Sequence, residues 1–185
     1  EIDENGGVTE YRYSAFSEAT EVVRYALGLG LALAVNRSDA LEISSQLQPS
    51  IDDRTVTTEY DRLGRKSRVL FDEVDYYDST TKSYGRARPE TVFRYNAFGD
   101  IIKQSQLRSI ENQGLDSEKK IWSDHYFYYN NKGQLTTEVD AGRYVTTYHY
   151  NAFGEQRLRT EYATPLSDNL SLANEPTQAD IVEAT

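Results

Sequence analysis

The feature that most constrains the fold is a repeated pentad, in which tyrosine is followed by a short polar residue, two variable residues and glycine. Four stretches match this pattern, and a fifth, at residues 13–17, keeps the frame with serine at the second and fifth positions. Alternating runs typical of β-strands precede and follow the copies. The anchor residues are Tyr13; Tyr60, Asp61 and Gly64; Tyr95, Asn96 and Gly99; Tyr129, Asn130 and Gly133; and Tyr150, Asn151 and Gly154.

Each pentad predicts the turn of a β-hairpin. Asparagine or aspartate opens such a turn because its short side chain bonds to nearby backbone N–H groups. Glycine closes the turn because the chain re-enters the second strand through a residue with positive φ. The tyrosine is then the last residue of the incoming strand, and its ring lies across the neighbouring hairpin. Ser17 stands where the other copies have glycine, so we expect modest backbone strain in the first copy.

A longer period links the two ends of the chain. Residues 8–16 align without a gap with residues 145–153, a shift of 137 positions, and the same shift places Tyr25 on Tyr162. This pattern predicts one large repeat over residues 8–144 and the start of the next over residues 145–185. We therefore expect residues 1–185 to be a fragment of a longer repeat protein.

Composition favours a mainly β protein. The chain has 15 tyrosines and six phenylalanines, which lie mostly beside valine and threonine. We predict tandem β-hairpins that form a curved antiparallel strip, with one or two short helical insertions, one of them at residues 38–48. Leucines that alternate with small residues within 25–35 indicate a buried extended segment, and the insertions at 72–89 and 109–124 read as loops or extended hairpin arms.

Charge and apolar content exclude several classes of partner. With 30 acidic and 20 basic residues the net charge is −10, which repels the phosphates of nucleic acids. The longest apolar stretch is too short to cross a membrane, so we expect no membrane span. The chain has no cysteine, which rules out disulfides and thiolate metal sites within it.

For each group of residues that could form a chemical site, a structural role explains the sequence better. His125 and His149 lie in tyrosine-rich strands, and we read them as residues of a partly buried sheet in preference to an acid–base pair. The acidic cluster at 72–78 lacks the spacing of a calcium loop. Aromatic residues that would suit sugar stacking also suit packing between hairpins. We expect no catalytic residue, no cofactor and no metal site. The acidic and aromatic candidates are Asp72, Glu73, Asp75 and Asp78, and Tyr76, Tyr77, Phe127, Tyr128 and Tyr129.

The pentads resemble a known family. Tyr60-Asp61-Arg62-Leu63-Gly64 followed by Arg65, together with the 21-residue step from Tyr129 to Tyr150, is similar to the YD repeat of the Rhs family. That family includes bacterial Rhs polymorphic toxins, the B and C components of insecticidal toxin complexes and, more distantly, teneurins. The resemblance covers roughly residues 8–166. The family's self-cleaving aspartyl segment has no match here.

The resemblance implies a function without catalysis. In this family consecutive hairpins form a strip that spirals into a hollow β-shell, which encloses a C-terminal effector or toxin polypeptide. We therefore expect a non-enzymatic wall segment of a secreted or cell-surface bacterial protein, with the rest of the shell and a polypeptide cargo as partners. Self-association through open sheet edges is a further expectation. The alternative is an extracellular recognition module that binds glycans or a cell-surface receptor through exposed aromatic residues.

Overall fold

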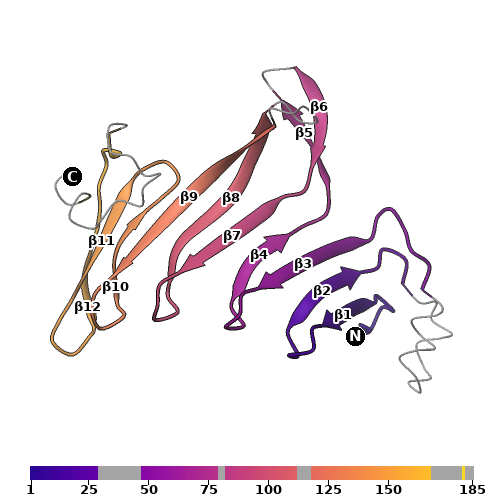
Figure 1. Cartoon of the computed structure of the whole chain (residues 1–185), viewed down its shortest axis with the longest axis horizontal. Helices are drawn as coiled ribbons and strands as arrows, with labels where there is room; N and C mark the ends of the chain where they lie inside the picture. The colour runs from indigo at the N-terminus through magenta and orange to yellow at the C-terminus, as the bar shows by residue number, and fades with distance from the viewer. Residues whose placement is uncertain (29–46, 79–81, 112–117, 168–180, 182–185) are drawn as a thin grey trace. The chain divides into compact units, whose positions relative to one another are not determined.

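The structure is a computed structural model that describes residues 1–28, 47–78, 82–111, 118–167 and 181. The prediction of a mainly β, antiparallel fold is confirmed, because most of the described chain lies in antiparallel strands (Figure 1). The chain divides into two compact units, Glu1–Glu90 and Thr91–Thr185. The predicted large repeat of residues 8–144 is a different division of the chain and stays a prediction.

The first unit contains a four-stranded antiparallel sheet in which strands follow one another in chain order. Its strands are β1 (Thr9–Tyr13), β2 (Ala19–Arg24), β3 (Arg54–Tyr60) and β4 (Lys66–Leu70). A separate two-stranded hairpin follows, made of β5 (Val74–Asp78) and β6 (Ser83–Ala87).

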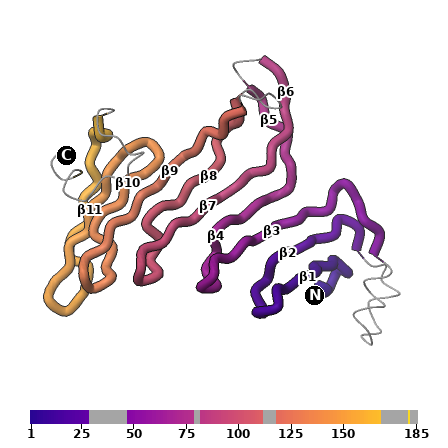
Figure 2. Tube along the Cα trace, viewed as in Figure 1, coloured from indigo at the N-terminus to yellow at the C-terminus, as the bar shows by residue number. Residues whose placement is uncertain are grey.

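The second unit is a longer meander of the same kind. It contains β7 (Glu90–Tyr95), whose first residue belongs to the first unit, then β8 (Ile101–Glu111), β9 (Lys119–Tyr129), β10 (Leu135–Val139), β11 (Val145–Tyr150) and β12 (Gln156–Glu161). The turns after β7, β9 and β11 lie at the same end of these strands (Figure 2).

Each unit buries a small apolar cluster against its sheet. In the first unit Val8 and Leu47 are buried, and Ile2 and Tyr25 pack against them. The second unit has a larger cluster, to which Tyr128 and Tyr162 add partly buried rings. Its buried members are Tyr126, Val139, Val145, Leu166 and Ile181.

The predicted insertions have different outcomes. The described residues of the segment at 72–89 include the hairpin β5–β6, and those of the segment at 109–124 belong mostly to the long strands β8 and β9, so the extended-arm prediction holds for the described residues at both places. The prediction of a buried extended segment is wrong at Leu27, which follows the end of β2 and is 58% exposed. The rest of that segment, residues 29–35, and residues 38–46 of the predicted helix lie outside the described residues.

No helix in the described part of the chain has the length and apolar character that a membrane crossing requires.

Candidate functional site

The most regular feature of the molecule is the pentad turn, in which one side chain organises the backbone. In the second copy the carboxylate of Asp61 accepts the N–H groups of Leu63 at 2.8 Å and of Arg65 at 3.0 Å. Its backbone N–H donates to the Arg65 carbonyl at 2.8 Å, and its carbonyl accepts the Gly64 N–H at 3.1 Å. The same four bonds recur around Ser14, Asn96, Asn130 and Asn151.

The fifth position of each pentad has positive φ. The four glycines Gly64, Gly99, Gly133 and Gly154 have φ between 74° and 96°. Ser17 has φ of 65°, a left-handed conformation that is unfavourable for a residue with a Cβ atom, as the sequence predicts. The pentads therefore lie between paired antiparallel strands, and each tyrosine is the last residue of its incoming strand.

The residue after each pentad closes the turn with its own side chain, a contact that sequence reasoning missed. The Asn96 amide donates to the Asp100 carboxylate at 2.9 Å, whereas Arg65 donates to the Asp61 carboxylate at 2.7 Å. In the Asn96 turn the second residue of the pentad is the donor, whereas in the Asp61 turn the second residue is the acceptor. Equivalent pairs are Ser14 with Glu18, Asn130 with Gln134 and Asn151 with Glu155. The Asp61 pKa is lowered by its hydrogen bond from Arg65.

Two further turns of the same backbone type were also missed. Asp3 accepts the N–H groups of Asn5 and Gly7, and its carbonyl accepts the Gly6 N–H at 3.1 Å. Asp140 accepts the Tyr144 N–H at 2.8 Å, and its carbonyl accepts the N–H of Arg143, which has φ of 69°. Neither aspartate follows a tyrosine, so a search keyed on tyrosine does not find them. The available signal was the 137-residue shift that relates Asp3 to Asp140.

The anchor tyrosines join successive hairpins by a hydrogen bond that we call the tyrosine lock. The Tyr60 hydroxyl donates to the Ala19 carbonyl at 3.0 Å, and Ala19 is the first residue of β2. Tyr129 donates to Ile101, the first residue of β8, at 3.0 Å. The Tyr150 hydroxyl donates to Leu135, the first residue of β10, at 2.8 Å. Each lock ties an incoming strand to the return strand of the hairpin before it.

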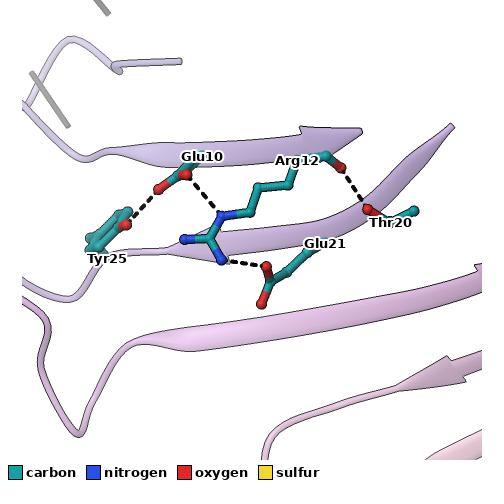
Figure 3. Close-up of polar contacts among 5 residues, drawn as sticks. All are labelled: Glu10, Arg12, Thr20, Glu21 and Tyr25. Carbon is teal, nitrogen blue, oxygen red and sulfur yellow. Dashed lines mark hydrogen bonds and ion pairs between the residues drawn. The ribbon is translucent and has the colours of Figure 1, made fainter. Parts of the chain in front are cut away.

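A charged cluster lies on one face of the β1–β2 hairpin (Figure 3). Arg12 donates to Glu10 at 3.0 Å and to Glu21 at 2.6 Å, and the Tyr25 hydroxyl donates to Glu10 at 2.6 Å. The Thr20 hydroxyl donates to the Arg12 carbonyl at 3.2 Å. The hydrogen bonds from Tyr25 and Arg12 lower the Glu10 pKa, and the carboxylate in turn raises the Tyr25 pKa. These shifts keep the carboxylate ionised and the phenol neutral.

A second polar cluster joins the long arms of the second unit. Lys103 contacts the Asp124 carboxylate at 2.9 Å, and the Ser105 hydroxyl donates to the other oxygen of Asp124 at 2.6 Å. Burial by itself lowers the Lys103 pKa, but hydrogen bonds to Asp124 and Tyr126 outweigh it, so the pKa is raised. The Ser105 hydroxyl and the Lys103 side chain thus share one partner, the Asp124 carboxylate. We interpret this cluster as a cross-strand contact.

A groove of about 690 Å³ lies over the charged cluster in the first unit. Its walls combine acidic side chains with arginines, and many of these groups have partners within the protein: Asp53 accepts the Ala26 N–H at 2.8 Å, and Arg88 donates to the Phe71 carbonyl at 3.0 Å. The groove is therefore a polar surface in which several charged groups are paired within the protein.

The histidines lie on β9 and β11, with β10 between these strands. Both side chains are exposed, so the predicted partial burial is wrong. His125 lies on the face of β9 opposite to Tyr126, which belongs to the apolar cluster, and its ring centroid is 6.4 Å from that of Phe127. His149 is on the same face of β11 as the buried Val145, but it lies four residues further along the strand, nearer the turn, where it is exposed.

The acidic residues at 72–78 that have described contacts bind other groups of the protein. The Asp72 carboxylate accepts the Thr55 N–H, and Glu73 and Asp75 lie 3.6 and 3.5 Å from Arg86. Within residues 1–28, 47–78, 82–111, 118–167 and 181, no group of three or more potential metal-ligating side chains occurs.

The aromatic candidates divide into packed and exposed residues. Tyr128 packs against the apolar cluster of the second unit, whereas Tyr77 is 54% exposed and contacts Tyr84 edge-on, with 5.4 Å between ring centroids. Sequence reasoning missed the most exposed rings, which lie at the fourth position of the pentads: Phe16, Phe98 and Phe153 are 85%, 92% and 89% exposed.

No protein-family model matches this chain, and a search of curated proteins finds no match either.

Proposed function

We propose that the chain is a non-catalytic wall segment of an Rhs-type β-shell, in which tandem YD hairpins enclose a polypeptide effector or toxin. The tyrosine lock is the observation that carries this proposal. It recurs at Tyr60, Tyr129 and Tyr150 with distances between 2.8 and 3.0 Å. A bond that fixes each hairpin to its predecessor is what a continuous wall requires, since an isolated two-stranded hairpin is marginally stable.

The polar character of the described sites supports the same role. The pairs Arg12–Glu21 and Lys103–Asp124 join neighbouring strands, and such cross-strand pairs stabilise a sheet. On this proposal the partners are the rest of the shell and an enclosed polypeptide, and open sheet edges would allow self-association. The setting would be a secreted or cell-surface bacterial protein.

The test uses the complete protein to which the chain belongs. Electron cryo-microscopy should show these hairpins in a closed wall around additional density, and limited proteolysis should leave an internal polypeptide intact. A double variant, Tyr60→Phe with Tyr150→Phe, should loosen the wall and speed digestion of that polypeptide, whereas Tyr84→Phe changes an exposed tyrosine that is not an anchor and serves as the control. An open strip with no enclosed polypeptide would refute the proposal.

The alternative is glycan recognition, and the exposed rings are the observation that favours it. Tyr77 and Tyr84 form an exposed aromatic pair on the separate hairpin β5–β6. A glycan array probed with the chain would detect saturable binding that is lost in Tyr77→Ala. Tyr128→Ala is not a clean test, because Tyr128 packs against the apolar cluster and its loss lowers stability.

A further inference from the structure

Two arginines lie side by side on the sheet of the first unit. Arg24 is the last residue of β2 and Arg54 is the first residue of β3, and the two are directly paired across these strands. Both are exposed, and among the residues that the structure describes neither guanidinium has an ion pair or a hydrogen bond. Like charges at directly opposite positions destabilise a sheet. In a chain with a net charge of −10, this pair therefore points to an anion that is not part of the protein.

The arginine pair lines a surface cavity of about 440 Å³ in the first unit. This volume lies within the range of about 300–1,000 Å³ that is usual for ligand sites. Asp3 and Asp52 line the same cavity, yet within the described part of the chain neither aspartate forms an ion pair with Arg24 or Arg54. The cavity thus offers cations and carboxylates to a ligand without neutralising them internally.

Backbone hydrogen bonds hold the acidic walls of the cavity in place. One carboxylate oxygen of Asp3 accepts the Gly7 N–H at 2.8 Å, whereas its second oxygen, Oδ2, has no described hydrogen bond. Asp53 accepts the Ala26 N–H at 2.8 Å and so fixes the loop that carries Asp52. The acceptors on this side of the cavity are therefore positioned before a ligand binds.

The combination of groups selects the chemistry of the ligand. A guanidinium presents planar N–H donors that match a carboxylate, so a carboxylate between the two arginines gains hydrogen bonds and removes their repulsion. The free carboxylate oxygens opposite them accept hydroxyl groups. A doubly charged phosphate fits less well, because the two aspartates and the net charge of the chain oppose it.

We propose that this cavity is a binding site for a sugar acid. Arg24 and Arg54 bind the sugar carboxylate, and ring hydroxyls donate to Asp3 Oδ2 and to Asp52. The exposed tyrosine pair of the hairpin β5–β6 does not line this cavity, and the site requires neither a closed wall nor an enclosed polypeptide. It can therefore fail or hold independently of both functions proposed above.

The first test is an NMR titration of the full 185-residue chain with glucuronate. Saturable shifts are expected for the backbone amides of residues 24 and 54 and for their side-chain Nε–H groups. Glucose, which has the ring hydroxyls without the carboxylate, should bind at least about tenfold more weakly, since charged hydrogen bonds are lost. The proposal is overturned if glucuronate does not bind, if glucose binds equally well, or if inorganic phosphate binds as tightly as glucuronate.

A pair of matched double variants separates the site from the charge of the chain. Arg24→Gln with Arg54→Gln should weaken glucuronate binding by at least about tenfold. Arg62→Gln with Arg157→Gln removes the same charge at exposed positions outside the cavity and should leave binding unchanged. Equal losses in the two double variants would show that overall charge governs binding, which would overturn the proposal.

Thermal denaturation provides a test that does not depend on measuring affinity. Without ligand, Arg54→Gln should raise the midpoint, because it removes the repulsion from Arg24. Glucuronate should raise the midpoint of the unchanged protein and have no effect on the variant, because a ligand stabilises only the state that binds it. A lower midpoint for Arg54→Gln without ligand would reveal a stabilising partner for Arg54 within the chain and would overturn the proposal.

Discussion

The hairpins β1–β2 and β11–β12 have equivalent backbone hydrogen bonds but different side chains at equivalent positions. Val8 accepts the Tyr25 N–H at 3.0 Å, and Val145 accepts the Tyr162 N–H at 2.9 Å. Positions that carry the charged pair Arg12 and Glu21 in the first hairpin carry His149 and Leu158 in the second. Both hairpins thus have the same turns and a buried valine, whereas the side chains nearer the turn differ.

The largest expected difference between the hairpins concerns their buried valines. Val145 is 1% exposed within a five-residue buried cluster, whereas Val8 is 4% exposed beside Leu47. Val145→Ala should lower the free energy of unfolding by about 2–3 kcal/mol because the rigid cluster retains a cavity, and Val8→Ala should lower it by only about 1 kcal/mol. Urea denaturation measures both. Equal losses would show that the two clusters are energetically equivalent.

Exchanging serine and glycine at the positive-φ position of the two turns should change the free energy of unfolding in opposite directions. Ser17→Gly should raise the free energy of unfolding by about 1 kcal/mol, since it removes the left-handed strain of a residue with a Cβ atom. Gly154→Ser should lower it by about the same amount. Thermal denaturation of the two variants and of the double exchange tests this. If both single variants lower stability, the serine has a contact that outweighs its backbone conformation.

The two hairpins also differ in the tyrosine lock, which is described for Tyr150 but not for Tyr13. Tyr150 donates to the Leu135 carbonyl, so Tyr150→Phe should lower the free energy of unfolding by about 1 kcal/mol. The equivalent Tyr13 is 62% exposed and has no lock in the described residues, so Tyr13→Phe should change it by less than about 0.5 kcal/mol. Denaturant titration of the pair provides the comparison, and a similar loss in both variants would argue against the lock.

The smallest expected effect is a pH dependence of the first hairpin alone. The folded-state pKa of Glu10 is below its ordinary value of 4.5, first because of the hydrogen bond from Tyr25 and then because of Arg12. Its stabilising contribution is therefore complete above pH 4.5 and is lost as pH falls through the lowered folded-state pKa. Because the cluster is partly exposed, we expect about 0.5 kcal/mol.

The Glu10 contribution can be isolated by substitution. Glu10→Gln should remove this pH dependence, and NMR titration of the side-chain carboxyl carbon should report the low pKa directly. Thr147 occupies the equivalent place in the second hairpin and does not titrate in this range. An ordinary pKa for Glu10 would contradict the prediction.

The sequence predicts the turns well because their conformation is local. Asn96 and Gly99 specify a turn without help from distant residues, which is why the pentad pattern locates strand ends. The Asp140 turn could not be found in this way, because Arg143 holds a positive φ while its guanidinium donates to the carbonyls of Leu166 and Ser167.

Contacts that depend on register were also beyond sequence reasoning. The charged cluster brings Glu21 opposite Arg12, and the tyrosine lock brings Tyr60 to Ala19, 41 positions earlier in the chain. Both need the alignment of two strands, which a bulge shifts by one residue near each turn. The exposure of His125 follows from the same alignment, since it decides which face of β9 meets the apolar cluster.

The lock has a consequence for how such a chain can change in length. Tyrosine, turn and acceptor carbonyl all lie at one end of each hairpin, whereas the long arms of β8 and β9 extend from the other end. Residues added or removed at that far end leave hydroxyl and acceptor in place. The distal tips of the hairpins are therefore natural graft points, where a foreign peptide could be displayed without disturbing how one hairpin is fastened to the next.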